Sequence, residues 1–230
     1  MDNIILLALA LAPVFALGSL IFWKDKWEKE PLKRLLFTFI AGMLSCIPII
    51  IIELSTDWIF APRDGSIKGA FLTAFIFVGL TEELGKWAAV MLFAYKKNDF
   101  NEPYDGIIYA VMASLGFAAI ENILYIYEGG MSVGIIRAFT AVPAHTIMGV
   151  LMGYFMGLAK FKPQKKKIYL LLSIIAPVLL HGSYNFSLYI PNEIIAWSGA
   201  LLSLGIGIFL ARRAMKIHAH SSPFNTQKHK

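Results

Sequence analysis

The chain has 230 residues, of which 57% are hydrophobic and 16% are charged, and its mean hydropathy is +0.64. A soluble domain of this length carries more charge, so the composition indicates an integral membrane protein with one membrane domain. The single cysteine, Cys46, excludes an intrachain disulfide and a cysteine-based zinc site. We interpret the net charge of +6 as basic cytoplasmic loops that touch membrane lipid, with no nucleic-acid partner.

Apolar segments of about the length that crosses a bilayer follow one another along the chain. The predicted fold class is therefore all-α, a polytopic membrane protein with about seven transmembrane helices. The predicted spans are 3–23, 35–54, 69–95, 105–127, 132–159, 168–190 and 194–211. The first is expected to be a retained helix, because no positive charge precedes it and no small-residue cleavage site follows it.

Basic residues are concentrated in alternate connections between these spans. Five lie in 24–34, two in 96–104, five in 160–167 and five from Arg212 onward, whereas the other connections hold few. The distribution predicts an N-terminus outside and a C-terminus in the cytoplasm. Arg137, near the start of the fifth span, is expected to snorkel outward. A polar cytoplasmic tail is predicted over 218–230, and its last stretch, SSPFNTQKHK, is expected to be disordered.

The third predicted span places two carboxylates and an ammonium inside an apolar segment, FVGLTEELGKWAAVMLFAY. Glu82 and Lys86 are four residues apart and share a helix face, while Glu83 points about 100° away. Lys86 could therefore pair with one acid while the other faces a cavity. A buried ion pair that only fixes helix packing needs a single acid, so the second acid favours a functional site.

Each of the next three predicted spans also carries an ionisable group. Glu121 lies in the fourth span, and His145 lies in the fifth on a stripe of small residues that includes Gly149. His181 and Asn185 lie one turn apart in the sixth. Each group alone has a structural explanation, such as a helix end that reaches water or an interhelical hydrogen bond. Together they predict a hydrated cavity where carboxylates and imidazoles meet.

These residue types suit hydrolysis by water. A buried glutamate can take a proton from water as the water attacks a carbonyl, and His or Asn donors can hold the developing oxyanion. The zinc motif HExxH, the aspartyl motif GxGD and the serine motif GxSxG are missing from the chain. Zinc is kept as an alternative cofactor, because enough ligand types are present, although their spacing matches no recognised site. Its ligands would be Glu82, Glu83, His145 and His181, with Glu121 as a further candidate.

Four short motifs carry a resemblance to a known family. EELGK (82–86), FAAIEN (117–122), HTIMG (145–149) and HGSYN (181–185) are similar to the EExxK, FxxxEN, HxxxG and HGxYN motifs of the PrsW family of intramembrane proteases. YDGIIYA (104–110) also agrees, and the match covers roughly the whole chain. The resemblance implies a protease of the bacterial cell membrane that cuts a single-span membrane protein, of the anti-sigma factor type, near the outer membrane face.

The resemblance also implies roles for the matched residues. In the wider superfamily, which includes CAAX prenyl endopeptidases, an acid pair activates water and a His and an Asn hold the oxyanion. Those relatives have a His where Glu121 stands, so Glu121 could be a further acid or a metal ligand. The expected catalytic residues are Glu82, Glu83, Glu121, His145, His181 and Asn185; the expected substrate-binding residues are Phe117, Asn122 and Tyr184; the expected structural partners are Lys86 and Gly149.

The expected organisation is a single protease domain over 1–217, with a catalytic core at about 69–190 and no favoured cofactor. Two other functions make different predictions for the sequence. A proton-coupled transporter would need polar groups through both leaflets, whereas the inner halves of the predicted spans are nearly free of them. A non-catalytic scaffold would have lost an acid or a histidine, and none is lost.

Overall fold

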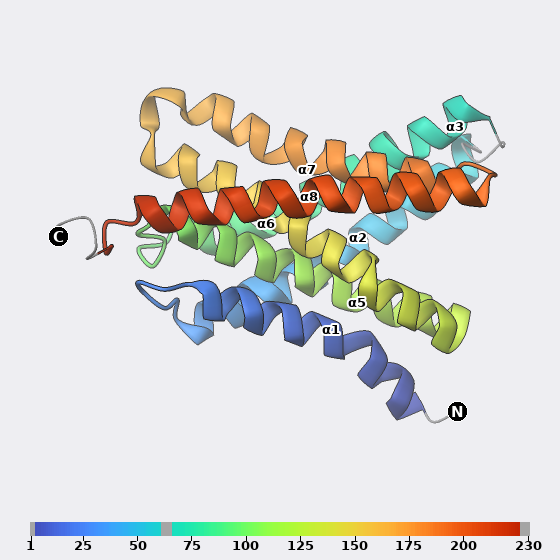
Figure 1. The fold of residues 1–230 in the computed structure, drawn as a ribbon, viewed down its shortest axis with the longest axis horizontal. Helices are drawn as coiled ribbons and strands as arrows, with labels where there is room; N and C mark the ends of the chain where they lie inside the picture. The colour runs from blue at the N-terminus through green and yellow to red at the C-terminus, as the bar shows by residue number, and fades with distance from the viewer. Residues whose placement is uncertain (1–2, 61–65, 226–230) are drawn as a thin grey trace.

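The computed structural model describes residues 3–60 and 66–225, and every regular element in these ranges is a helix (Figure 1). The described part of the chain therefore has the predicted all-α class. The start of α1 and the end of α8 lie at opposite ends of an elongated bundle. In chain order the elements are α1 (Asn3–Lys24), α2 (Leu32–Phe60), α3 (Ile67–Leu72), the π-helix η1 (Thr73–Leu80), α4 (Thr81–Val90), the π-helix η2 (Met91–Tyr95), α5 (Pro103–Phe139), α6 (Ala141–Phe161), the 3-10 helix η3 (Pro163–Lys165), α7 (Lys166–Leu188) and α8 (Glu193–Ser221).

Within the described residues, five stretches are long and apolar enough to cross a membrane: Asn3–Lys24, Leu32–Ser55, Pro103–Phe161, Pro163–Leu188 and Glu193–Ser221. The third stretch contains two predicted spans, because only Thr140 separates α5 from α6. The predicted span at 69–95 is not among the five, since it is divided among four short elements and carries three ionisable residues. The chain is a multi-pass membrane protein with five candidate spans, and the total of seven and the orientation stay predictions.

The path between α5 and α6 differs from the prediction. The sequence predicts a connection at 128–131, but the helical path breaks at Gly130 and again at Thr140. Gly130 has a φ of 71°, a left-handed conformation that glycine adopts without a steric penalty. Residues 131–139 form a short helical piece between the breaks. This piece holds Arg137 against Glu121, so the prediction that Arg137 snorkels outward is wrong.

The last helix is longer than hydropathy predicts. A span ending at 211 is expected, but α8 continues to Ser221 because Ala211, Ala214 and His218 are buried. His218 Nε2 lies 2.8 Å from the carbonyl oxygen of Tyr154 in α6. The disorder predicted for the tail is therefore wrong for 221–225, where Ser222 donates a hydrogen bond to Glu102. The remainder of the predicted tail lies outside the described residues.

The centre of the bundle is the pair α5 and α6. Gly149, Gly153 and Gly157 form a stripe on α6 that lies directly on the backbone of α5. A Cβ atom on Gly153 would lie 2.1 Å from the carbonyl oxygen of Gly106, and one on Gly149 would lie 2.9 Å from the Cα of Val111. Small residues at spacing four let the two backbones approach closely. This contact fixes the position of His145, one turn before Gly149.

Gly153→Ala is expected to lower the stability of the folded bundle by about 1–3 kcal/mol, the usual cost of overpacking a tight core. The matched control is Gly205→Ala in α8, where a Cβ atom would meet no other atom within 4 Å. Thermal unfolding of both purified variants in the same detergent measures the difference. Equal melting temperatures for the two variants would contradict the close contact between α5 and α6.

Candidate active site

The acid pair lies in the first turn of α4, directly after the π-helix η1. Such π-helical turns are frequently found at functional sites. Lys86, one turn further on, places its Nζ 3.0 Å from Glu82 Oε2 and 2.7 Å from Glu83 Oε1. All three side chains are buried. The prediction that Lys86 pairs with only one of the two acids is therefore wrong, because the ammonium is bonded to both.

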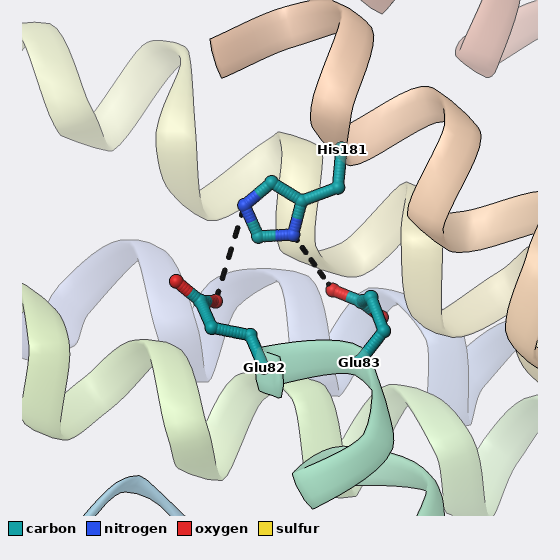
Figure 2. A group of neighbouring side chains, drawn as sticks. All are labelled: Glu82, Glu83 and His181. Atoms are coloured by element: carbon teal, nitrogen blue, oxygen red, sulfur yellow. Dashed lines mark hydrogen bonds and ion pairs between the residues drawn. The ribbon is translucent and has the colours of Figure 1, made fainter. Parts of the chain in front are cut away.

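His181 of α7 lies over the acid pair (Figure 2). Its Nδ1 lies 2.9 Å from Glu83 Oε1, and its Nε2 lies 4.0 Å from Glu82 Oε2. An ionised carboxylate only accepts hydrogen bonds, so Nδ1 carries a hydrogen and donates it to Glu83. A separation of 4.0 Å is too long for a direct hydrogen bond and has room for one bridging water. Glu82 and His181 Nε2 thus frame a water position.

His145 of α6 extends the same network away from Glu83. The Lys86 ammonium also donates to His145 Nδ1 at 3.0 Å. Because Nδ1 accepts, Nε2 carries the hydrogen, and it donates to Glu121 Oε2 at 2.7 Å. Lys86 therefore uses its three N–H groups on three side chains and lies 4.5 Å from the ring centre of Phe117. Helices α4, α5, α6 and α7 all contribute to one connected set of charges.

Arg137 is a member of this network that sequence reasoning missed. Its Nη2 lies 3.3 Å from Glu121 Oε2, and its Nε donates to Asn122 Oδ1 at 2.7 Å. Asn122 in turn donates to the carbonyl oxygen of Ala10 at 3.0 Å. The sequence feature that could have indicated this role is the isolated arginine in an apolar segment, because a charge inside a membrane protein is stable only when it is paired. A similar signal, an acid in the run IIIIEL, marks Glu53, which lines a cavity beside this network.

A cavity of about 550 Å³ opens beside these residues. Of the predicted site residues, its lining includes Glu82, Phe117, Glu121, His145, His181, Tyr184 and Asn185. Glu83, Lys86, Asn122 and Gly149 are not part of the lining. The structure thus separates the two acids: Glu82 faces the cavity, while Glu83 lies behind it and contacts Lys86 and His181. Asn122 lies behind Arg137, and whether it contacts a substrate stays a prediction.

Two groups of side chains have the donor types that hold a metal ion, Glu82–Glu83–His181 and Glu82–Glu121–His145. In each group the ligand atoms lie within 4.8 Å of one another. The Lys86 ammonium, however, is already bonded to Glu82, to Glu83 and to His145. A dication there would be repelled by this ammonium at short range in a dry environment. With Lys86 in this position, the arrangement of the residues does not fit a bound metal.

Buried carboxylates, two histidines and a water-sized gap at a cavity are the groups that an intramembrane hydrolase needs. Sequence comparison identifies the family: the profile of the "PrsW family intramembrane metalloprotease" matches residues 30–218. The chain belongs to this PrsW family. It is accordingly a multi-pass protease of the bacterial cell membrane.

Curated relatives agree with this assignment. The chain is 39% identical over 183 residues to Protease PrsW of Geobacillus kaustophilus, covering 80% of this chain and 79% of the relative. It is 36% identical over 184 residues to Protease PrsW of Bacillus subtilis, covering 80% and 82%. It is also 36% identical over 206 residues to Protease PrsW of Clostridioides difficile, covering 86% and 83%. No solved structure matches the chain significantly.

Proposed function

We propose that the chain hydrolyses a peptide bond of a single-span membrane protein, of the anti-sigma factor type, with a water activated by Glu82. The observation that carries this mechanism is the position of the acid pair. Glu82 faces the cavity and lies 4.0 Å from His181 Nε2, whereas Glu83 has no part in the cavity lining. Of the two adjacent acids, Glu82 is therefore the one that a water and a substrate carbonyl can both reach.

In the proposed reaction, a water bound between Glu82 and His181 attacks the carbonyl carbon of the scissile bond. Glu82 takes one proton from the water, and the carbonyl oxygen becomes an oxyanion. The Asn185 amide and a protonated His181 Nε2 donate hydrogen bonds to this oxyanion. The tetrahedral intermediate then collapses, the C–N bond breaks, and the proton held by Glu82 passes to the leaving nitrogen. Glu83 accepts from His181 Nδ1 and stabilises the imidazolium.

The remaining charged residues position the reacting ones. Lys86 compensates the charge of both acids and fixes the hydrogen of His145 on Nε2. Glu121 accepts from that nitrogen and is itself compensated by Arg137. His145 also lies edge-on to His181, with ring centres 5.7 Å apart. In this proposal Glu121 and His145 maintain the geometry of the acid pair rather than attack the substrate.

We propose that the cut lies near the outer membrane face, in a bundle of seven spans with the N-terminus outside. Support comes from the position of the cavity along the helices. Its lining includes Glu128 of α5, Leu188 at the end of α7 and Trp197 near the start of α8. These residues lie at the end of the bundle away from the basic stretch 160–167 and from Arg212. The positive-inside rule places those basic residues in the cytoplasm, which leaves the cavity end outside.

A zinc mechanism with the same residues is the second candidate. The family description contains the word metalloprotease, and two groups of side chains have suitable donor types. Zinc would have to displace the Lys86 ammonium from Glu82 and Glu83. The two mechanisms therefore differ in one measurable requirement, the need for metal.

Purified wild-type protein in detergent is expected to cut a single-span membrane substrate equally well with and without a strong zinc chelator. Mass spectrometry of the products locates the cut, which is expected in the outer third of the span. Loss of cleavage on chelation, restored by added zinc, would replace the glutamate mechanism with the zinc mechanism. Cleavage on the cytoplasmic side would overturn the proposed orientation but leave the chemistry of the site untouched.

A further inference from the structure

A second group of acidic side chains lies at the opposite end of the bundle from the cavity. The loop after α1, the loop before α5 and the end of α8 meet there (Figure 1). Trp27 Nε1 in the first loop donates to the carbonyl oxygen of Ala219 in α8 at 2.9 Å. Ser222 donates to Glu102. We refer to the acidic residues of this region, Asp25, Glu28, Glu30, Glu102 and Asp105, as the basal cluster.

Part of the basal cluster has clear structural partners. Asp105 Oδ2 accepts from the backbone N–H groups of Asn101 and Glu102, each at 2.7 Å, at the start of α5. Glu30 Oε2 accepts from the hydroxyl of Tyr109. These bonds explain why Asp105 and Tyr109 of the YDGIIYA motif are buried. They account for one carboxylate oxygen each of Asp105 and Glu30.

Asp25 is the member whose burial has no structural explanation. Its exposed fraction is 1%, and neither carboxylate oxygen has a hydrogen-bond partner in the described parts of the chain. One carboxylate oxygen of each of Glu28, Glu102 and Asp105 is also buried without a hydrogen-bond partner in these parts of the chain. A buried oxygen without a partner is costly, and native proteins usually satisfy such atoms with a protein group, a water or an ion.

Lysine side chains near the cluster do not supply the missing partner. Lys29 Nζ donates to the backbone carbonyl oxygens of Phe22 at 2.6 Å and of Asp25, at the end of α1. Lys160 Nζ donates to the carbonyl oxygen of Tyr95 at 2.8 Å. Within the described residues, no ion pair with Asp25, Glu102 or Asp105 is formed. The cluster thus has an excess of negative charge over hydrogen-bonded cations.

Asp25 lies among other charged side chains of this region. It is close enough to the Glu102, Asp105 and Glu28 carboxylates, and to the Lys29 ammonium, for their charges to interact. Three acids and one cation are therefore the electrostatic neighbours of this unpartnered carboxylate. A positive ion beside Asp25 would supply the partner that its two oxygens lack.

We propose that the basal cluster binds one Mg²⁺ ion, with Asp25 as a direct ligand and with Glu102 and Asp105 bound through waters of the ion. The donors are all carboxylate oxygens, which suits a hard cation and does not favour zinc. Among the described residues, three ligand atoms within 4.8 Å of one another are found only in the two active-site groups. The proposed ion therefore has a single direct protein ligand, Asp25. Mg²⁺ can bind in this way because it keeps several waters and needs only one or two carboxylates. The ion ties the loops before α2 and α5 to the end of α8.

Thermal unfolding of the full chain in an uncharged detergent tests this site. Mg²⁺ at about one hundred times its Kd is expected to raise the Tm of the wild type by about 5–10 °C over the value in EDTA. Asp25→Asn is expected to melt higher than the wild type in EDTA, because it removes an unpaired buried charge, and to show no rise with Mg²⁺. Glu102→Gln, which keeps an oxygen for Ser222, is expected to show a reduced rise and provides a second variant.

Two controls locate the ion. Glu193→Gln removes an exposed carboxylate at the other end of α8 and is expected to respond to Mg²⁺ as the wild type does. Glu82→Gln is expected to keep the full response, which places the ion outside the active site. Binding of Mn²⁺ in place of Mg²⁺, counted by electron paramagnetic resonance, should be lost in Asp25→Asn and kept in Glu82→Gln. An equal Mg²⁺ response in the wild type and Asp25→Asn, or no response in the wild type, would overturn the proposal.

Discussion

Glu82→Gln is expected to lower the rate of peptide-bond cleavage by about 10²–10⁴-fold, the usual contribution of a general base. A glutamine keeps the shape of the side chain and can still accept from Lys86, but it cannot take a proton from water. The protein should therefore fold normally and bind substrate with little change in KM. Single-turnover cleavage of a single-span membrane substrate by purified protein measures the loss directly.

Glu83→Gln provides the matched comparison, because it changes the neighbouring acid in the same way. Glu83 lies outside the cavity lining and orients His181 through a bond of 2.9 Å. We expect a smaller loss, about 10–100-fold, which is typical when an orienting partner of a reacting group is altered. Glu193→Gln, an exposed acid, should cleave at the wild-type rate. If Glu83→Gln lost more activity than Glu82→Gln at equal folded fraction, the roles of the two acids would be reversed.

Lys86→Met is expected to produce the largest loss of stability of any single substitution in the site, about 3–5 kcal/mol. The side chain is fully buried and is the hydrogen-bonded cation for both Glu82 and Glu83. Removing one partner of a buried ion pair leaves uncompensated charge in a low-dielectric interior, which accounts for a cost of this size. Unfolding of the purified protein in mixed micelles measures it. Lys68→Met, at an exposed lysine, is the matched control and should have no such effect.

A double variant separates the lost charge from the lost packing. Lys86→Met combined with Glu83→Gln removes an acid together with its counter-ion, so part of the lost stability should return. Activity should not return, because His145 loses the ammonium that fixes its hydrogen on Nε2 and His181 loses the carboxylate charge that stabilises its imidazolium. A double variant as unstable as Lys86→Met alone would mean that the methionine disturbs packing and that the charge balance matters little.

Sequence reasoning located the residues of the network but not the contacts among them. Glu82, Glu121, His145 and His181 could be found because an ionisable residue in an apolar segment is conspicuous on its own. Their meeting at one cavity follows from the rotation and approach of four helices, which one sequence does not specify. The glycine stripe on α6 was the best local indication, since close packing at Gly153 implies a buried face next to His145.

The differences from the predicted elements have identifiable causes. Hydropathy alone could not detect the two breaks at Gly130 and Thr140, because the residues between them are as apolar as a true span. Arg137 was predicted to point outward because the sequence does not reveal its partner. That partner, Glu121, lies sixteen positions away and across a helix break. The end of α8 was placed too early because its last turns bury small residues and His218, which carry little hydropathy signal.

The ion pairs of α4 also bear on how the chain is made. The segment 67–95 is helical throughout, yet it is not among the stretches apolar enough to enter a bilayer independently. The histidine and aromatic partners that surround its charged groups come from α5, α6 and α7, which are synthesised later. We therefore expect stable insertion of this segment to depend on the helices that follow it. If membrane integration and assembly of the active site are coupled in this way, a chain truncated before α7 should have neither a fully embedded segment nor a protease site.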